Sequence, residues 1–231
     1  MNSKVSCLLF DFDNTLVDFS GAAKSALWDS FEDVGVKCTE EIYSIYQVVN
    51  HEHWQAFEQG KLDAKNLRHR RFEALFRQID KLDLDPHSFS KEFLQHLIMN
   101  SLAYEGVKDL LNRLKENYVL GLVTNGLKEV QRPRLHRLNM THYFDSIIVS
   151  DEIGVAKPQE EFFSYAYDSL PKSFDKDEIM IIGDSLNSDI LGGNNFGIKT
   201  CWISHGREGN PDIPADFEIQ QVDEIERILS I

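Results

Sequence analysis

Cysteine is scarce in this sequence, and its pattern limits the redox chemistry available to the protein. The 231 residues include three cysteines, at positions 7, 38 and 201, and no CxxC pair. Their number is odd, they are far apart, and two of them lie inside apolar runs. We therefore expect buried, reduced thiols rather than a disulfide framework.

The chain also lacks a long hydrophobic segment and an excess of basic residues. The apolar run from Val5 to Phe12 is short and is interrupted by Asp11, so it does not match a signal peptide. The net charge is −14, from 24 Lys and Arg against 38 Asp and Glu. Such a chain has no basic surface for counterion release. We expect a cytoplasmic monomer or homodimer that binds neither a nucleic-acid polymer nor a membrane.

The first half of the chain has a helical pattern. From about Ser20 to Asn100 there is no convincing strand pattern, and apolar residues recur at spacings of three and four, which predicts a bundle of about four helices. The apolar positions form four groups: Leu27, Phe31 and Val34; Ile42, Ile45, Tyr46 and Val49; Leu67, Phe72, Leu75, Phe76 and Ile79; Phe89, Phe93, Leu94, Leu97 and Ile98. We expect these residues to face a core.

The remainder of the chain alternates between helix and strand patterns, which predicts a parallel sheet covered on both faces. Strands are predicted before Asp11 and at 118–124, 146–150, 179–183, 199–203 and 217–219, with helices at 107–116, 129–138, 160–169, 189–196 and 222–231. The fold class is therefore α/β, a Rossmann-like three-layer core with an all-α insertion. We expect residues 1–17 and 101–231 to form the core and residues 18–100 to form the helical unit.

Two carboxylates follow the first predicted strand directly. Open α/β sheets bind ligands at the carboxyl ends of their parallel strands. Strand alternation directs Asp11 and Asp13 to one side and Phe12 to the other. Two adjacent acids repel each other, so the sequence predicts a reaction site that requires a cation.

Three further motifs end later strands. Thr124 and Asn125 offer a hydroxyl and exposed backbone N–H groups suited to a phosphate oxygen. Pro158 is expected in the first turn of a helix, which leaves Lys157 free to point at the sheet edge. The last motif is Gly-Asp-Ser-Leu-Asn-Ser-Asp at 183–189, with Asp184 at the strand tip and Asp189 as a second acid or a helix N-cap.

In this order, DxDxT, TNG, KP and GDxxxxD resemble the motifs of the haloacid-dehalogenase (HAD) superfamily over the whole chain, and the helical insertion resembles its C1 cap. The resemblance implies a Mg²⁺-dependent phosphomonoester hydrolase with an aspartyl-phosphate intermediate. Asp11 would be the nucleophile and Asp13 the general acid and base. Thr124, with the backbone N–H groups of Phe12 and Asn125, would hold the phosphoryl group.

The resemblance also implies how the charges are neutralised. Lys157 would neutralise the nucleophile and the transferring group. Asp11, the backbone carbonyl of Asp13, and Asp184 would hold Mg²⁺, the hard cation that an all-oxygen site suits. Asp189 would orient a metal-bound water or Lys157.

Several stretches resemble more closely the bacterial pyrimidine 5′-nucleotidases, which hydrolyse nucleoside monophosphates including noncanonical ones. These stretches are Gln47-Val48-Val49-Asn50 with Trp54, Arg71-Phe72-Glu73, Thr124-Asn125-Gly126 with Gln131 and Arg134-Leu135, Val155 to Pro158, and Ser188 to Gly193. Asn50, Trp54 and Arg71 are the candidates for contacts to the base or the ribose. The core motifs are equally compatible with a sugar-phosphate or N-acylneuraminate 9-phosphate phosphatase.

Two other functions fit the sequence less well. A 2-haloacid dehalogenase does not need a general acid two residues after its nucleophile, so Asp13 favours phosphate chemistry. A non-catalytic binding protein of this fold would not need the nucleophile, the acid, the lysine and the metal-binding acids together.

Overall fold

The computed structural model describes residues 5–229, and its centre is a six-stranded parallel sheet. The strands are β1 (Cys7–Phe10), β2 (Val119–Thr124), β3 (Ser146–Val149), β4 (Ile179–Gly183), β5 (Lys199–Ile203) and β6 (Phe217–Ile219). Their order is β3-β2-β1-β4-β5-β6. In the sheet, β2 and β3 lie on one side of β1, and β4, β5 and β6 lie on the other side. This reversal places the end of β1 at a topological switch point.

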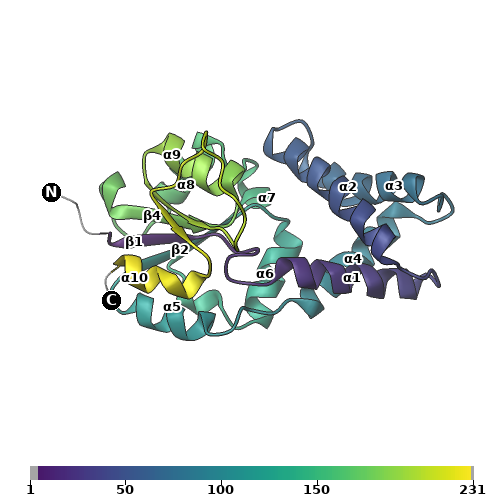
Figure 1. Cartoon of the computed structure of the whole chain (residues 1–231), viewed down its shortest axis with the longest axis horizontal. Coiled ribbons are helices and arrows are strands. Elements are labelled where there is room, and N and C mark those ends of the chain that lie inside the picture. Colours follow the sequence, from purple (N-terminus) through teal and green to yellow (C-terminus); the bar gives the residue numbers. More distant parts are fainter. Residues whose placement is uncertain (1–4, 230–231) are drawn as a thin grey trace.

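Helices cover both faces of the sheet (Figure 1). They are α5 (Val107–Lys115), α6 (Lys128–Arg137), α7 (Ser150–Ile153), α8 (Glu160–Asp168), α9 (Leu191–Phe196) and α10 (Ile225–Leu229). Leu8 and Phe10 pack in a cluster with α5, α6 and α10, whereas Cys7 and Leu9 pack in a second cluster with α8 and α9. Strand alternation therefore supplies two apolar faces, as a doubly covered parallel sheet requires.

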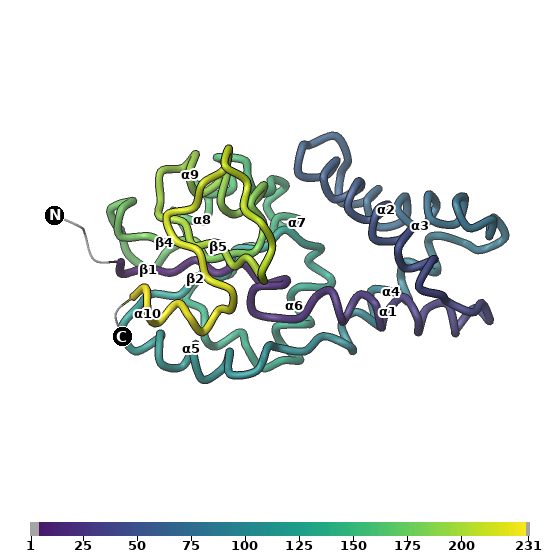
Figure 2. Tube along the Cα trace, viewed as in Figure 1, coloured from purple at the N-terminus to yellow at the C-terminus, as the bar shows by residue number. Residues whose placement is uncertain are grey.

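The insertion after β1 is a bundle of four helices, which extends to one side of the core (Figures 1 and 2). They are α1 (Phe19–Asp33), α2 (Glu40–Glu58), α3 (Ala64–Gln78) and α4 (Pro86–Asn100). Each begins after a side chain that accepts a backbone N–H bond from its first turn, namely Asp18, Thr39, Asp63 and Asp85. Such N-caps satisfy donors that a helix start leaves unpaired. We call α1 to α4 the cap.

The cap has an aromatic core of its own. Phe72 lies within 5.1 Å of the ring centroids of both Phe89 and Phe93, and all three side chains are buried. Leu127 and Val130, at the start of α6, join this cluster from the core. The cap is therefore packed against α6 by apolar contacts.

Most predicted elements lie where the sequence placed them, and the exceptions have local causes. Val34 is exposed because α1 ends at Asp33. Ser150 begins α7 instead of ending β3. The predicted helix at 189–196 starts earlier, as a π-helical turn from Leu186 to Ile190, because the Ser185 side chain caps it. The last helix is preceded by a 3₁₀ turn, Val222–Glu224, and its final two residues lie outside the described part.

All three cysteines are buried and unpaired, as predicted. Among residues 5–229, no helix is long and apolar enough to cross a lipid bilayer.

Candidate active site

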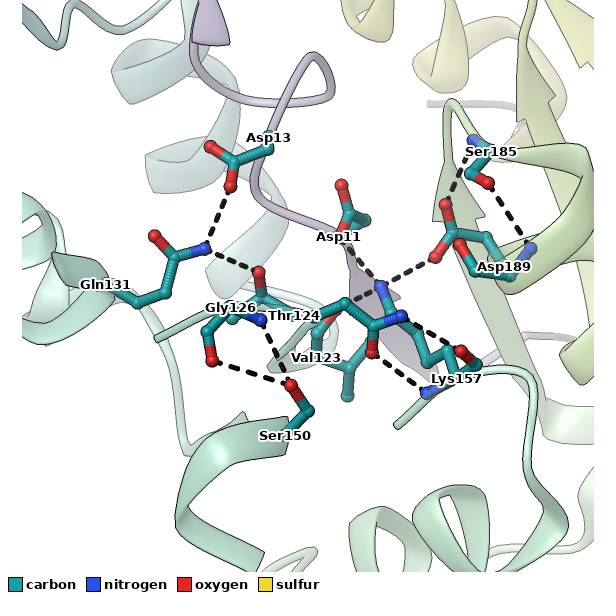
Figure 3. A network of polar contacts seen from close by, with 12 residues as sticks. Asp11, Asp13, Val123, Thr124, Gly126, Gln131, Ser150, Lys157, Ser185 and Asp189 are labelled. Carbon is teal, nitrogen blue, oxygen red and sulfur yellow. Dashed lines mark hydrogen bonds and ion pairs between the residues drawn. The ribbon is translucent and has the colours of Figure 1, made fainter. Parts of the chain in front are cut away.

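The ammonium group of Lys157 is buried between two acids at the carboxyl ends of the strands. Its Nζ lies 2.7 Å from Oδ1 of Asp11, 2.7 Å from Oδ1 of Asp189 and 2.7 Å from the carbonyl oxygen of Val123 (Figure 3). Burial lowers the pKa of Lys157, but the two carboxylates outweigh it, so the pKa is raised. All three ammonium protons have acceptors, which fixes the lysine as a cation at the site.

The interpretation of Pro158 as a first-turn residue is wrong. Helix α8 begins at Glu160, with Gln159 as its N-cap, and Pro158 lies in the preceding turn after a cis peptide bond. The side chain of Lys157 nevertheless points to the sheet edge, as expected, and the Asn125 side chain holds its backbone. Asn125 Oδ1 accepts from the Lys157 N–H, and Asn125 Nδ2 donates to the Lys157 carbonyl, both at 2.9 Å.

Three carboxylates converge beside this lysine. Oxygen atoms of Asp11, Asp184 and Asp189 all lie within 4.8 Å of one another. Burial, followed by the charge of Asp189, raises the pKa of Asp184 to about 7, and burial raises the pKa of Asp11 as well. Asp11 and Asp189 are buried and Asp184 is half-buried, and acids this close repel each other when ionised.

Asp189 approaches the end of β4 because residue 183 is glycine. A Cβ atom at Gly183 would lie 2.3 Å from the Asp189 carboxyl carbon. Both oxygens of Asp189 have partners, since Oδ1 contacts Lys157 and Oδ2 accepts from the Ser185 N–H. Asp11 and Asp184 are therefore better placed than Asp189 to offer an oxygen to a cation, and this oxygen-rich donor set fits Mg²⁺.

Asp13 lies apart from this cluster and has its own partners (Figure 3). Its Oδ2 accepts from Gln131 Nε2 at 2.9 Å, and its Oδ1 lies 2.7 Å from Nη1 of Arg134. Gln131 Nε2 also donates to Thr124 Oγ1 at 2.8 Å. Gln131 and Arg134 had no predicted role, although their spacing of three places them on one face of α6.

The phosphate-binding candidates are only partly open to the cavity. Thr124 is completely buried and does not line it, whereas Asn125 does. Phe12 packs in the core. Within residues 5–229, the backbone N–H groups of Phe12 and Asn125 have no hydrogen-bond acceptor. These two donors remain available to a ligand at the strand ends.

The cap supplies the other wall of the same cavity. Asn50, Trp54 and Arg71 line it together with all four core acids and Lys157. Arg71 is 2% exposed, donates to Asn50 Oδ1 at 2.8 Å, and packs on the rings of Phe72 and Phe93. Burial lowers the pKa of Arg71. No carboxylate among the described residues forms an ion pair with its guanidinium, and its Nε has no partner.

A cap glutamate that was not predicted from the sequence also lines the cavity. Glu58, the last residue of α2, accepts a hydrogen bond from Asn125 Nδ2 at 3.1 Å. Burial raises its pKa, and the Asn125 hydrogen bond opposes this effect. The sequence did hold a signal for Glu58, because a residue four positions after Trp54 lies on the same face of a helix.

Fold and site together define a hydrolase of the α/β class, with clustered carboxylates at the switch point of the sheet and a helical cap that completes the cavity. The chain matches the family model described as haloacid dehalogenase-like hydrolase over residues 8–203. It belongs to this family, and its fold is the α/β HAD fold with a helical cap.

Relatives cover nearly the whole chain. Identity is 34% to the HAD-hydrolase YfnB of Bacillus subtilis, covering 97% of this chain and 95% of the relative. Identity is 33% to pyrimidine 5′-nucleotidase YjjG of Escherichia coli, covering 96% of each chain. It is 31% to pyrimidine 5′-nucleotidase PynA of Streptococcus pneumoniae, covering 92% of this chain and 90% of the relative. The crystal structure of YfnB bound to magnesium has a TM-score of 0.93, 32% identity, and coverage of 99% of this chain and 100% of that one.

Proposed function

We propose that the protein is a Mg²⁺-dependent phosphomonoester hydrolase that acts on pyrimidine nucleoside 5′-monophosphates, including noncanonical ones. The observation that carries the proposal is the position of Lys157, buried between Asp11 and Asp189 in a cavity that the cap completes. A buried cation next to a carboxylate nucleophile suits the transfer of a dianionic phosphoryl group.

Asp11 attacks phosphorus and forms an aspartyl-phosphate, while the alkoxide of the substrate leaves. Lys157 holds Oδ1 of Asp11, which leaves Oδ2 for the attack. Asp13 gives a proton to the departing alkoxide and then takes one from the water that hydrolyses the intermediate. The free N–H groups of Phe12 and Asn125 bind phosphoryl oxygens. Thr124, the last residue of β2, positions the neighbouring N–H group of Asn125.

The carboxylate cluster suits a magnesium ion held by Asp11, the backbone carbonyl of Asp13, and Asp184. When bound, Mg²⁺ would supply charge neutralisation for the clustered acids and the substrate phosphate. Asp189 has both oxygens occupied by Lys157 and Ser185, which supports its assignment as a group that orients Lys157.

The substrate preference rests on the cap and on the relatives. Trp54 offers a flat apolar surface for a base, and Asn50 and Arg71 offer hydrogen-bond donors at the cap end of the cavity. YjjG and PynA, both pyrimidine 5′-nucleotidases, align with this chain through cap and core alike.

The test is phosphate release from a panel of monoesters with Mg²⁺. The panel contains UMP, dUMP and dTMP, 3′-UMP, purine nucleotides and hexose phosphates. We expect the pyrimidine 5′-nucleotides to have the highest kcat/KM. A higher value for 3′-UMP or a hexose phosphate would refute the nucleotidase assignment and leave the phosphatase assignment intact.

A further inference from the structure

One face of helix α2 runs along the cavity from the catalytic groups into the cap. Asn50, Trp54 and Glu58 are separated by four residues, so they lie on one side of the helix, and all three line the cavity. Each step of four residues advances about 6 Å along a helix. Glu58 contacts Asn125 of the core, whereas Asn50 contacts Arg71 of the cap. The three side chains therefore mark successive depths of the cavity.

Their order matches the order of groups in a nucleoside monophosphate. The phosphate belongs at the strand ends, beside Asn125 and Lys157. A base belongs against Trp54, with its outer edge towards Asn50 and Arg71. The group between phosphate and base is the sugar, and the side chain at that depth is Glu58.

The chemistry of Glu58 defines what it can bind. An ionised carboxylate only accepts hydrogen bonds. One oxygen of Glu58 accepts from Asn125, and within residues 5–229 its Oε2 has no hydrogen-bond donor. The negative charge of Glu58 would repel a phosphate dianion placed beside its Oε2. The ligand group next to this oxygen must therefore be a hydrogen-bond donor. Hydroxyl groups of a sugar are such donors, and carboxylates bind ribose hydroxyls in dinucleotide sites for the same reason.

We propose that Glu58 accepts a hydrogen bond from a ribose hydroxyl of the substrate and thereby selects nucleotides over phosphate esters that lack one. This inference rests on the proposed function, since it assumes a nucleotide in the cavity. The competing interpretation is that Glu58 only joins the cap to the core. Its backbone carbonyl accepts from Gln159 Nε2 at 3.3 Å, so such a role is also compatible with its contacts.

The two interpretations predict different kinetics when residue 58 and the substrate are varied in the same set of measurements. We would measure kcat/KM of the unchanged protein, Glu58→Ala and Glu58→Gln with UMP, with 2′,3′-dideoxyuridine 5′-monophosphate and with p-nitrophenyl phosphate. A hydrogen bond to a charged group contributes about 1.5–3 kcal/mol, which corresponds to about 10- to 150-fold. We expect Glu58→Ala to reduce kcat/KM for UMP by at least about ten-fold more than for the other two substrates.

Two variants keep the result interpretable. Glu58→Gln retains an acceptor oxygen, so it should lose less activity on UMP than Glu58→Ala does. Glu52→Ala, at an exposed position of the same helix, should leave the ratio between substrates unchanged.

The proposal is overturned if Glu58→Ala lowers all three values by the same factor, as a simple cap-to-core contact would, or if it lowers none of them. Failure of the proposed function has a different signature, because the unchanged protein would then hydrolyse UMP no better than p-nitrophenyl phosphate.

Discussion

Nη1 of Arg134 lies 2.7 Å from Oδ1 of Asp13, and the guanidinium is completely buried where the cap joins the core. Arg134 Nε donates to Ser101 Oγ, directly after α4, and its guanidinium carbon lies 5.6 Å from the ring centre of Phe19, the first residue of α1. Arg134 therefore contacts both connections between core and cap as well as Asp13. The side-chain position of Asp13 is tied to the position of the cap through this residue.

Gln131 holds Asp13 and Thr124 with one amide group, so its loss should disturb the proton transfer more than binding. We expect Gln131→Leu to lower kcat about ten-fold, a part of the 10²–10⁴-fold contribution typical of general acid–base catalysis, with little change in KM. Steady-state kinetics with UMP would measure both constants. Arg132→Gln is the matched control, because Arg132 is on the same helix but pairs with Glu152 at the surface. An effect confined to KM would contradict the positioning role.

Substitution of either motif acid should stop turnover without unfolding the protein. Asp11→Asn removes the proposed nucleophile and Asp13→Asn removes the proposed proton donor, and each should reduce kcat by about 10³-fold or more. Circular dichroism would verify the fold, and Asp83→Asn, in an exposed cap loop, should retain activity. Substantial hydrolysis by purified Asp11→Asn would exclude the covalent mechanism.

Magnesium should stabilise the folded protein because the carboxylate cluster exists only in that state. A ligand at a hundred times its Kd adds about 2.7 kcal/mol to the free energy of unfolding, so saturating Mg²⁺ should raise Tm. EDTA should abolish activity. Full activity in protein shown by elemental analysis to be free of metal would refute the metal assignment.

The raised pKa of Asp184 predicts how stability changes with pH in metal-free protein. An aspartate has a pKa of about 3.9 when unfolded, against about 7 in the folded state. Between these values the folded state binds more protons, so this group's contribution to stability falls as pH rises. We expect thermal denaturation without metal to show a Tm decrease from about pH 4 to about pH 7 that is smaller in Asp184→Asn. Equal slopes in both proteins would be inconsistent with the shifted pKa.

Trp54 should contribute to the choice of substrate rather than to the chemistry. Trp54→Ala removes apolar surface from the cavity, so it should reduce the preference for pyrimidine nucleotides over p-nitrophenyl phosphate by about ten-fold, the equivalent of about 1.4 kcal/mol. Comparison of kcat/KM for the two substrates would measure this ratio. A ratio equal to that of the unchanged protein would assign Trp54 to cap packing, where it contacts Phe57.

The core could be predicted well from sequence because its signals are local. The bounds of β4, β5 and β6 agree with the prediction residue for residue, and β4 and β5 are short runs followed directly by turn-forming residues. The acids at the strand ends follow from the same pattern, because parallel strands bring their carboxyl ends to one edge.

The contacts between cap and core could not be predicted in this way. Glu58 and Asn125 are 67 positions apart, and Asp13 and Gln131 are 118 apart. No periodicity within either segment indicates these pairs. The burial of Arg71 against Asn50 likewise depends on how α2 and α3 pack. The sequence placed Asp13 and Asn125 at strand ends and the other residues in helical segments, and only the packing of cap against core brought them together at the cavity.

We propose that this cavity selects a pyrimidine nucleotide for hydrolysis at Asp11. Internal competition tests it most directly, because equal concentrations of dUMP and N-acylneuraminate 9-phosphate in one reaction with Mg²⁺ give the ratio of their kcat/KM values from the two rates of consumption. We predict that dUMP is consumed at least ten-fold faster, a difference of about 1.4 kcal/mol in transition-state binding. Faster consumption of the neuraminate phosphate would contradict the account.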